Sequence, residues 1–207
     1  MSTATKKNPW PKLEAGTEDG RRRRSDRSRR RIIEAMFDLI SEGHMSPSAV
    51  DVAERASVGL RTVFRHFADM DSIYDEMTAE LTEAVMPKFL APYEAGTWRE
   101  RLMECVDRRA GIYETVFPMR VCMMLRRFQS NFLGEQYERE TKLSRSALKS
   151  ILPKQVTANR ELFGAIEALL DFSTWRQLRQ DQNRSVESAK ASLRLALNGL
   201  IADVDAD

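Results

Sequence analysis

At 207 residues the chain is long enough for one medium-sized domain or two small ones. Charged residues make up 31% of it, whereas glycine and proline are few, a balance that suits a helical protein better than a sheet protein. The net charge of +2 conceals an asymmetry, because residues 1–31 hold 11 Lys or Arg and 4 Asp or Glu, a net of +7 that leaves −5 for the rest. Such a basic segment is expected to meet phosphates or an anionic membrane surface.

Several functional classes are not expected from this sequence. Cys105 and Cys122 have no CxxC spacing and no neighbouring histidine, so we expect two buried thiols in a reducing compartment, without a metal site or disulfide. No apolar run approaches the length of a membrane span and the N-terminus lacks a hydrophobic leader, which favours a cytoplasmic protein with no membrane partner. The chain has no glycine-rich phosphate loop and no hydrolase motif, and only His44 and His66 as candidate bases. We therefore predict that it is not an enzyme and needs no cofactor.

The N-terminal segment divides into a tail and a run of arginines. Residues 1–20 lack periodicity and contain two prolines and two glycines, so residues 1–24 are predicted to be a disordered basic tail. The run RRRRSDRSRRR occupies residues 21–31. It is interpreted either as a flexible arm that reaches the minor groove of DNA through Arg27, Arg29 and Arg30, or as a solvated basic tail that adds only non-specific attraction.

Four helices are predicted over residues 25–89. The first covers 26–42, where apolar residues recur at helical spacing and Gly43 ends the pattern. The second covers 48–55 and opens with an S-x-x-D cap at Ser48 and Asp51. After a tight turn at 56–59, a third helix covers 60–67, and a fourth covers 71–89.

The segment 48–67 has the pattern of a helix-turn-helix. Such a motif needs a small residue where two helices cross, a turn that tolerates left-handed backbone and apolar residues that dock the second helix. Ala53 is the small residue at the crossing, and Ser57 and Gly59 lie in the turn. The apolar docking residues are Val52, Val58 and Val63. An ordinary pair of core helices would show similar alanine and valine patterns. If the motif binds DNA, Arg61, Thr62, Arg65 and His66 are left on or near its outer face, where such side chains bond base edges or phosphates.

The segment from about Arg29 to Met77 resembles the DNA-binding domain of the tetracycline-repressor (TetR) family, and the rest of the chain matches the family only in length and all-helical layout. The family pattern is matched in register by Gly43, Asp51, Val52, Ala53, Ala56, Val58, Thr62, Val63, Phe64, His66, Phe67 and Ile73. The resemblance implies a DNA-binding domain over residues 25–72, with Leu60, Arg61, Thr62 and Arg65 facing base edges in the major groove. It places Ser48, Phe64 and His66 at or near phosphates and Phe67 in the core.

Three positions depart from the family pattern. Ser57 stands where glycine is usual, so its backbone is expected to be strained. Gly59 replaces the serine that usually caps the recognition helix, and Met70 replaces a lysine that usually meets the DNA backbone. The loss of that lysine predicts weaker non-specific affinity.

Beyond residue 92 the pattern stays helical. Helices are predicted at 97–117, 119–132, 134–152, 157–180 and 185–204, with Pro118 as a restart. No strand or internal repeat is found. We therefore predict an all-α protein of about nine helices, in which residues 73–207 form a helical effector-binding and dimerisation domain.

The resemblance implies that the last two helices, at about 157–175 and 185–201, form a four-helix bundle with a second subunit. An effector pocket, if present, is predicted between residues 97 and 152. Its candidate lining residues, which would equally suit an ordinary core, are Trp98, Met103, Tyr113, Met119, Met123, Met124, Phe128 and Phe132. Arg120, Arg126 and Arg127 would attract an acidic ligand or lie on the surface.

The function that these features favour is a homodimeric transcriptional repressor that binds a palindromic operator in double-stranded DNA and is released by a small-molecule effector. The alternative is a helical protein-interaction module with only weak, non-specific tethering to DNA.

Overall fold

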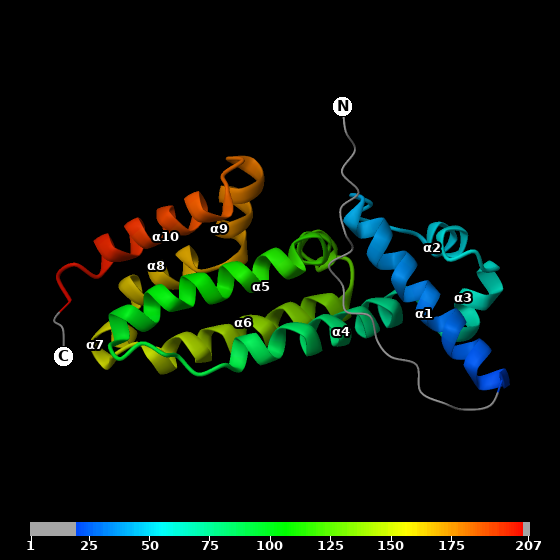
Figure 1. Ribbon diagram of the computed structural model, residues 1–207, viewed down its shortest axis with the longest axis horizontal. Coiled ribbons are helices and arrows are strands. Elements are labelled where there is room, and N and C mark those ends of the chain that lie inside the picture. The colour runs from blue at the N-terminus through cyan, green and yellow to red at the C-terminus, as the bar shows by residue number, and fades with distance from the viewer. Residues whose placement is uncertain (1–19, 205–207) are drawn as a thin grey trace. The chain divides into compact units, whose positions relative to one another are not determined.

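The computed structural model describes residues 20–204, in which every regular element is helical (Figure 1). The chain forms two compact units, residues 1–84 and 85–207, which we call the head and the body. The division lies within one continuous helix, α4 (Met70–Leu90), whereas the sequence placed it after residue 72. No linker marks this boundary, because the helix runs through it.

The head is built from the helices that the sequence predicted. Its helix-turn-helix consists of α2 (Ala49–Arg55) and α3 (Leu60–His66), which pack on α1 (Gly20–Ser41). Every fourth or third residue of α1 faces inward, and its core residues are Ile32, Ile33, Met36, Phe37, Leu39 and Ile40. Val52, Ala53, Val63 and Phe67 are also buried in the head, whereas Val58, the third apolar residue predicted to dock the recognition helix, is only half-buried.

The arginine run is helical as far as the structure describes it. α1 begins at Gly20, six residues before the predicted start at Asp26. The predicted tail therefore has its last residues, 20–24, inside a helix, and residues 1–19 lie outside the described part of the chain. Arginine has a high helix propensity, and nothing between residues 21 and 31 interrupts helical pairing.

The turn between α2 and α3 has the strain that its sequence predicted. Ser57 has φ of 53°, in the left-handed region that glycine adopts without cost. Gly59 is the N-cap residue of α3 and gives it no side-chain cap. By contrast, α2 begins with a complete capping box, in which Ser48 accepts from the Asp51 backbone and the Asp51 carboxylate accepts from the Ser48 backbone.

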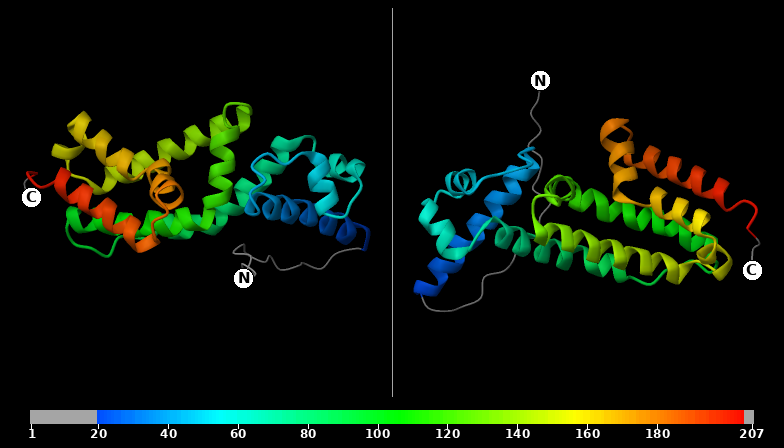
Figure 2. Two further views of the ribbon diagram at one scale, coloured as in Figure 1. Left: turned by 90° about the horizontal axis from the view of Figure 1, so that it is seen from above. Right: turned by 180° about the vertical axis from the view of Figure 1, so that it is seen from behind.

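The body contains seven more elements within the described residues. They are α5 (Trp98–Arg126), α6 (Asn131–Ile151), α7 (Lys154–Ala158), α8 (Arg160–Leu169), α9 (Phe172–Arg176), the π-helical turn η1 (Gln177–Asp181) and α10 (Val186–Leu200). α5 packs beside α6, and α10 packs against α5 and α8 (Figures 1 and 2). Their shared core includes Leu102, Val106, Phe163, Ile166, Trp175, Leu193 and Leu197.

Two predicted boundaries in the body are wrong. Pro118 does not restart the chain but lies inside α5, which leaves its initial direction near its C-terminal end (Figure 2). The single helix predicted at 157–180 is divided into α7, α8, α9 and η1. The breaks occur where Asn159 and Asp171 cap new helices through side-chain acceptors, bonds that compete with helix continuation.

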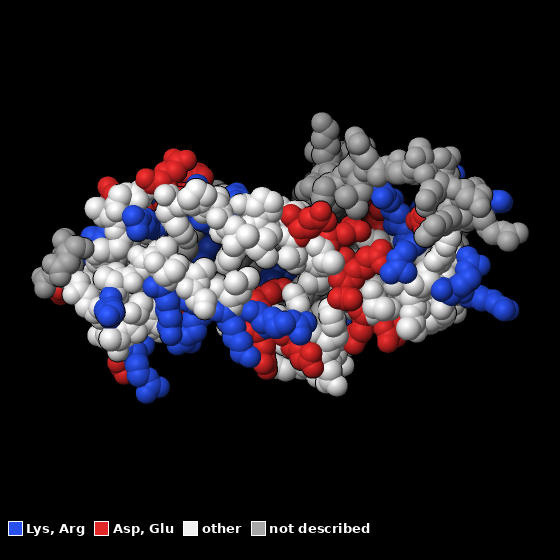
Figure 3. Space-filling model, turned by 90° about the horizontal axis from the view of Figure 1, so that it is seen from below, with Lys and Arg blue, Asp and Glu red and all other residues white. Residues whose placement is uncertain are grey.

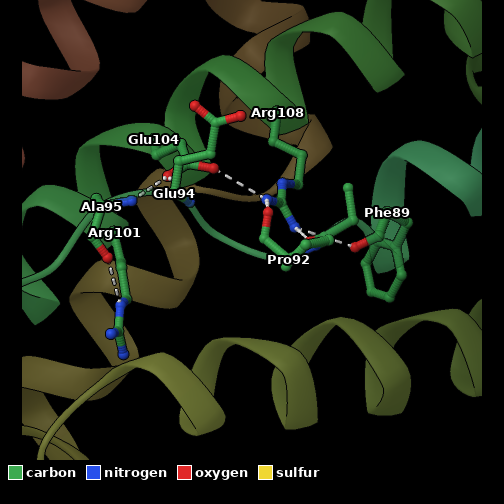
Figure 4. A network of polar contacts seen from close by, with 8 residues as sticks. Phe89, Pro92, Glu94, Ala95, Arg101, Glu104 and Arg108 are labelled. Carbon is green, nitrogen blue, oxygen red and sulfur yellow. Dashed lines mark hydrogen bonds and ion pairs between the residues drawn. The ribbon is translucent and has the colours of Figure 1, made fainter.

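Arg108 of α5 holds the end of α4 and the segment after it (Figure 4). Its guanidinium donates to the carbonyl oxygens of Phe89, Ala91 and Pro92 and is paired at 3.0 Å with Glu104. The other carboxylate oxygen of Glu104 accepts from the backbone of Glu94 at 3.0 Å. One of the last carbonyls of α4, that of Phe89, and two carbonyls of the segment after it are thus bonded by α5.

No helix in the described part of the chain is long and apolar enough to cross a membrane.

Candidate nucleic-acid interface

The recognition helix α3 has one buried face and one exposed face. Val63 and the following Phe67 are 1% and 2% exposed and anchor the helix in the head. On the other side, Leu60 and Phe64 are 41% and 51% exposed, and Arg61 and Arg65 are exposed as well. Thr62 is half-buried between the two faces. The predicted base-facing residues therefore share one surface, except that Thr62 lies at its margin.

The exposed face of α3 has the chemistry that a major groove requires. Arginine bonds the two acceptors of guanine and also binds phosphates, while exposed leucine and phenylalanine can contact thymine methyl groups. Two large apolar side chains of a seven-residue helix are left in water, although neighbouring positions are buried. Such exposed apolar residues, beside arginines, indicate a surface that contacts a partner.

Ser48 lies at the N-terminus of α2, where the sequence predicted a phosphate contact. Its hydroxyl donates to the Asp51 carboxylate at 2.7 Å, and its backbone donates to the same oxygen at 2.8 Å. These bonds lower the pKa of Asp51 below its usual value. The hydroxyl hydrogen of Ser48 is thus occupied in the cap, and the adjacent Val50 is 49% exposed.

His66 is half-buried at the end of α3, and its Nε2 atom is buried without a hydrogen-bond partner. Burial lowers the pKa of His66, and the charges of Arg65 and Arg29 lower it further. The predicted phosphate contact of His66 stays a prediction.

The three arginines predicted to contact DNA from the basic run have different surroundings. Arg29 is engaged inside the head: it donates to the His66 carbonyl oxygen at 2.7 Å, pairs with Glu76 and stacks 4.3 Å from the Phe67 ring centre. Arg27 and Arg30 are exposed on α1. Periodicity could have separated them, because residue 29 lies one helical turn before the buried Ile32 and Ile33.

Sequence reasoning missed a hollow beside the recognition helix. It is lined by Arg24, Ser25 and Ser28 from α1 and by Arg65 from α3. The signal that could have found it is the helical phase of the basic run, which places Ser28 and Arg24 on one face. On the surface that Figure 3 shows, lysine and arginine side chains lie beside a band of acidic side chains.

A cluster of acidic residues in the head is formed by α1 and α4. Burial raises the pKa of Glu80, and the negative charges of Glu76, Glu34 and Glu83 raise it further. This cluster is distinct from the exposed arginines of α3.

The predicted effector residues do not form one group. Trp98, Met119 and Met123 are buried, Met103, Tyr113, Met124 and Phe132 are half-buried, and Phe128 is 81% exposed. Trp98 and Met119 are almost six helical turns apart along α5. The exposure of Phe128 removes it from any enclosed pocket.

Tyr113 lies at the centre of an aromatic and basic cluster in the body. Its hydroxyl donates to the Leu170 carbonyl oxygen at 2.8 Å, which also accepts from Arg109 at 2.9 Å. Phe172 contacts the Tyr113 ring edge-on, with ring centres 5.4 Å apart. Nearby, the Arg120 side chain is only 14% exposed and pairs with Glu140. Burial raises the pKa of the Tyr113 phenol, so it remains a neutral donor.

The helices predicted to form a dimer retain exposed apolar surface. Leu195 of α10 is 77% exposed and Leu200 is 38% exposed. Leu195 continues a stripe of exposed small residues, Ala191, Gly199 and Ala202, at helical spacing. α10 packs against α8, whose Ala168 is also exposed.

These observations define an all-helical protein with an N-terminal helix-turn-helix head, and known structures share its fold. A transcriptional regulator from Rhodococcus sp. Rha1 superposes with a TM-score of 0.62 at 16% sequence identity, over 86% of this chain and 96% of that one. A putative TetR-family transcriptional regulator from Mesorhizobium loti MAFF303099 superposes with a TM-score of 0.55 at 18% identity, over 86% and 97%. Comparison of the sequence with protein-family models and with curated proteins gives no match. The chain thus has the TetR-type fold that residues 43–73 predicted.

Proposed function

We propose that this protein is a sequence-specific DNA-binding regulator of transcription. The observation that carries the proposal is the outer face of α3, where Arg61 and Arg65 stand beside the exposed Leu60 and Phe64 on a helix anchored by Val63. A helix of this width fits the major groove, and its side chains match the groups that base edges present there. The similar solved structures carry the description of transcriptional regulators, which supports the same conclusion.

The regulator acts as a homodimer in this proposal. Two heads can read the two half-sites of a palindromic operator only if the subunits are joined by a twofold axis. The exposed stripe around Leu195 supplies the apolar surface for that contact, with α8 beside it. A four-helix interface from α8 and α10 of each subunit would bury this surface.

Release from DNA is proposed to follow the binding of a small effector in the body. The cluster around Tyr113 and Arg120 supports this site, because it combines aromatic rings with buried polar donors. The effector would stabilise body conformations in which the heads no longer match the operator, and this shift lowers affinity for DNA. Repression is the expected outcome where the operator overlaps a promoter.

The function is tested by selecting bound sequences from random duplex DNA with the purified protein at near-physiological salt. The expected result is an inverted repeat whose half-sites are about one helical turn apart. Enrichment of no sequence above background would overturn the proposal. In that case, the helical protein-interaction module would be the better account.

A further inference from the structure

The basic run of this protein forms a rigid helical face. Within α1, Arg27, Ser28 and Arg31 lie three, four and seven residues after Arg24, so the four side chains share one side of the helix. The three arginines are exposed. On another side of the same turns, Arg29 is fixed to His66, Phe67 and Glu76. These contacts hold the rotation of α1 relative to the recognition helix.

The hollow between α1 and α3 has the composition of an anion site. The described residues that line it are two arginines, Arg24 and Arg65, and two serines, Ser25 and Ser28, around a space of about 530 Å³. Ser28 Oγ donates to the Arg24 carbonyl oxygen at 3.0 Å. The guanidinium groups of Arg24 and Arg65 carry the hydrogen-bond donors that suit a phosphate. Guanidinium groups form the strongest hydrogen bonds to phosphate oxygens.

The dimensions of DNA decide which anion this face meets. An α-helix with its side chains is about 10 Å wide, whereas the minor groove of B-DNA is about 6 Å wide. A basic segment that is helical cannot enter the minor groove in the way that an extended arm does. The major groove beside it receives α3 itself. The sugar–phosphate backbone is the part of the duplex that remains within reach of Arg24 and Arg27.

We propose that Arg24, Ser25, Ser28 and Arg65 form a binding site for a DNA backbone phosphate, extended along α1 by Arg27 and Arg31. This inference rests on the proposed function and deepens it, because it assigns Arg65 to the backbone and leaves Arg61 as the base-reading arginine. The site fixes α3 in the groove from one side. Its contribution is independent of base sequence.

The test compares the double variant R24Q/R65Q with the control R139Q/K142Q, which removes two positive charges from the exposed surface of α6. Binding to a selected duplex is measured by fluorescence anisotropy at several salt concentrations. The expected result is that R24Q/R65Q lowers the slope of log affinity against log salt by about 2, since each lost phosphate contact removes about 0.9. The control keeps the wild-type slope, and the ranking of different duplex sequences is unchanged in both variants.

A second measurement uses the wild-type protein, so it does not depend on the folding of a variant. Uncharged methylphosphonates replace the phosphates next to each half-site, one position at a time. We expect one position to weaken the wild-type protein and to leave R24Q/R65Q unaffected. An unchanged salt slope, or a changed ranking of base sequences in R24Q/R65Q, would overturn the phosphate site. If instead the wild-type protein selects no sequence, the proposed function fails, while the salt slope on any duplex still tests the site.

Discussion

Arg29 joins the first helix to the end of the recognition helix. Its Nη1 atom donates to the His66 carbonyl oxygen at 2.7 Å, and its guanidinium lies 4.3 Å from the centre of the Phe67 ring. The same group pairs with Glu76 of α4. One side chain therefore ties α1, α3 and α4 together at the point where α3 ends. This arrangement gives Arg29 a structural role, although its neighbours Arg27, Arg30 and Arg31 are exposed.

Replacement of Arg29 by methionine is expected to destabilise the protein by about 1–2 kcal/mol, because a charge-assisted hydrogen bond and a cation–π contact are lost. Affinity for DNA should fall, since α3 is held less firmly. The slope of log affinity against log salt should stay the same, because no phosphate contact is removed. Thermal unfolding and anisotropy at several salt concentrations measure these effects. A lower slope with unchanged stability would show that Arg29 contacts DNA directly.

The backbone conformation of Ser57 lowers the stability of the folded protein. A non-glycine residue with φ of 53° costs about 1–2 kcal/mol, which glycine avoids, but the greater entropy of glycine in the unfolded chain offsets part of that gain. Ser57→Gly is therefore expected to raise the free energy of unfolding by about 0.5–1 kcal/mol. Ser57→Ala, which keeps the strain, should give no gain. Equal stability of the two variants in chemical denaturation would contradict this explanation.

His66 should make the head sensitive to pH. Burial lowers its pKa most, Arg65 and Arg29 lower it further, and Asp26 and Glu76 oppose them. As pH falls through the unfolded-state value of about 6.5, the unfolded chain takes up the proton before the folded one does, so stability decreases. The loss is less than about 1.4 kcal/mol per pH unit for one group.

His66→Gln removes this titration, so the free energy of unfolding of the variant should change less than that of wild type between pH 7.5 and 5.5. Other groups, including Glu80 with its raised pKa, contribute equally to both proteins and cancel in the difference. If the profiles of stability against pH are parallel for wild type and His66→Gln, His66 has the same pKa in the folded and the unfolded state.

The proposed dimer depends on Leu195, which is 77% exposed in the single chain. Leu195→Glu would place two carboxylates in the interface through the twofold axis and remove two buried leucines, a loss of about 3–6 kcal/mol per dimer. Sedimentation velocity should then show monomers, and binding to an inverted repeat should weaken to that of a half-site. Leu143→Glu, on α6, is the control and should remain dimeric. A dimer that survives Leu195→Glu would place the interface elsewhere.

The head was predictable from sequence because its signals are local. The Ser48–Asp51 capping box, the apolar spacing of α1 and the turn at Ser57 each act within a few residues. Gly43, with φ of 99°, follows the end of α1 at Ser41, as predicted. Such features reflect backbone geometry that one residue type satisfies better than others.

The errors arose where tertiary contacts or helical phase decide. Pro118 was interpreted as a break, but its helix continues because packing on both sides outweighs the lost hydrogen bond. Helical phase places Arg29 one turn before Ile32 and Ile33, but its partner His66 is 37 residues away and could not be named from the local pattern. Arg24 was assigned to a tail and Ser28 was left unused, since the helix was predicted to begin at residue 26 and begins at Gly20.

The most direct test of the account is the ratio of affinities for a selected operator and for a random duplex. We expect Arg61→Ala to reduce the difference in binding free energy between the two duplexes, and with it this ratio, by about 1–3 kcal/mol, because a bidentate contact to guanine is lost. Lys142→Gln, a loss of one positive charge from the exposed surface of α6, should leave the ratio unchanged. If Arg61→Ala lowers both affinities equally, α3 does not read bases and the protein is tethered to DNA by charge alone.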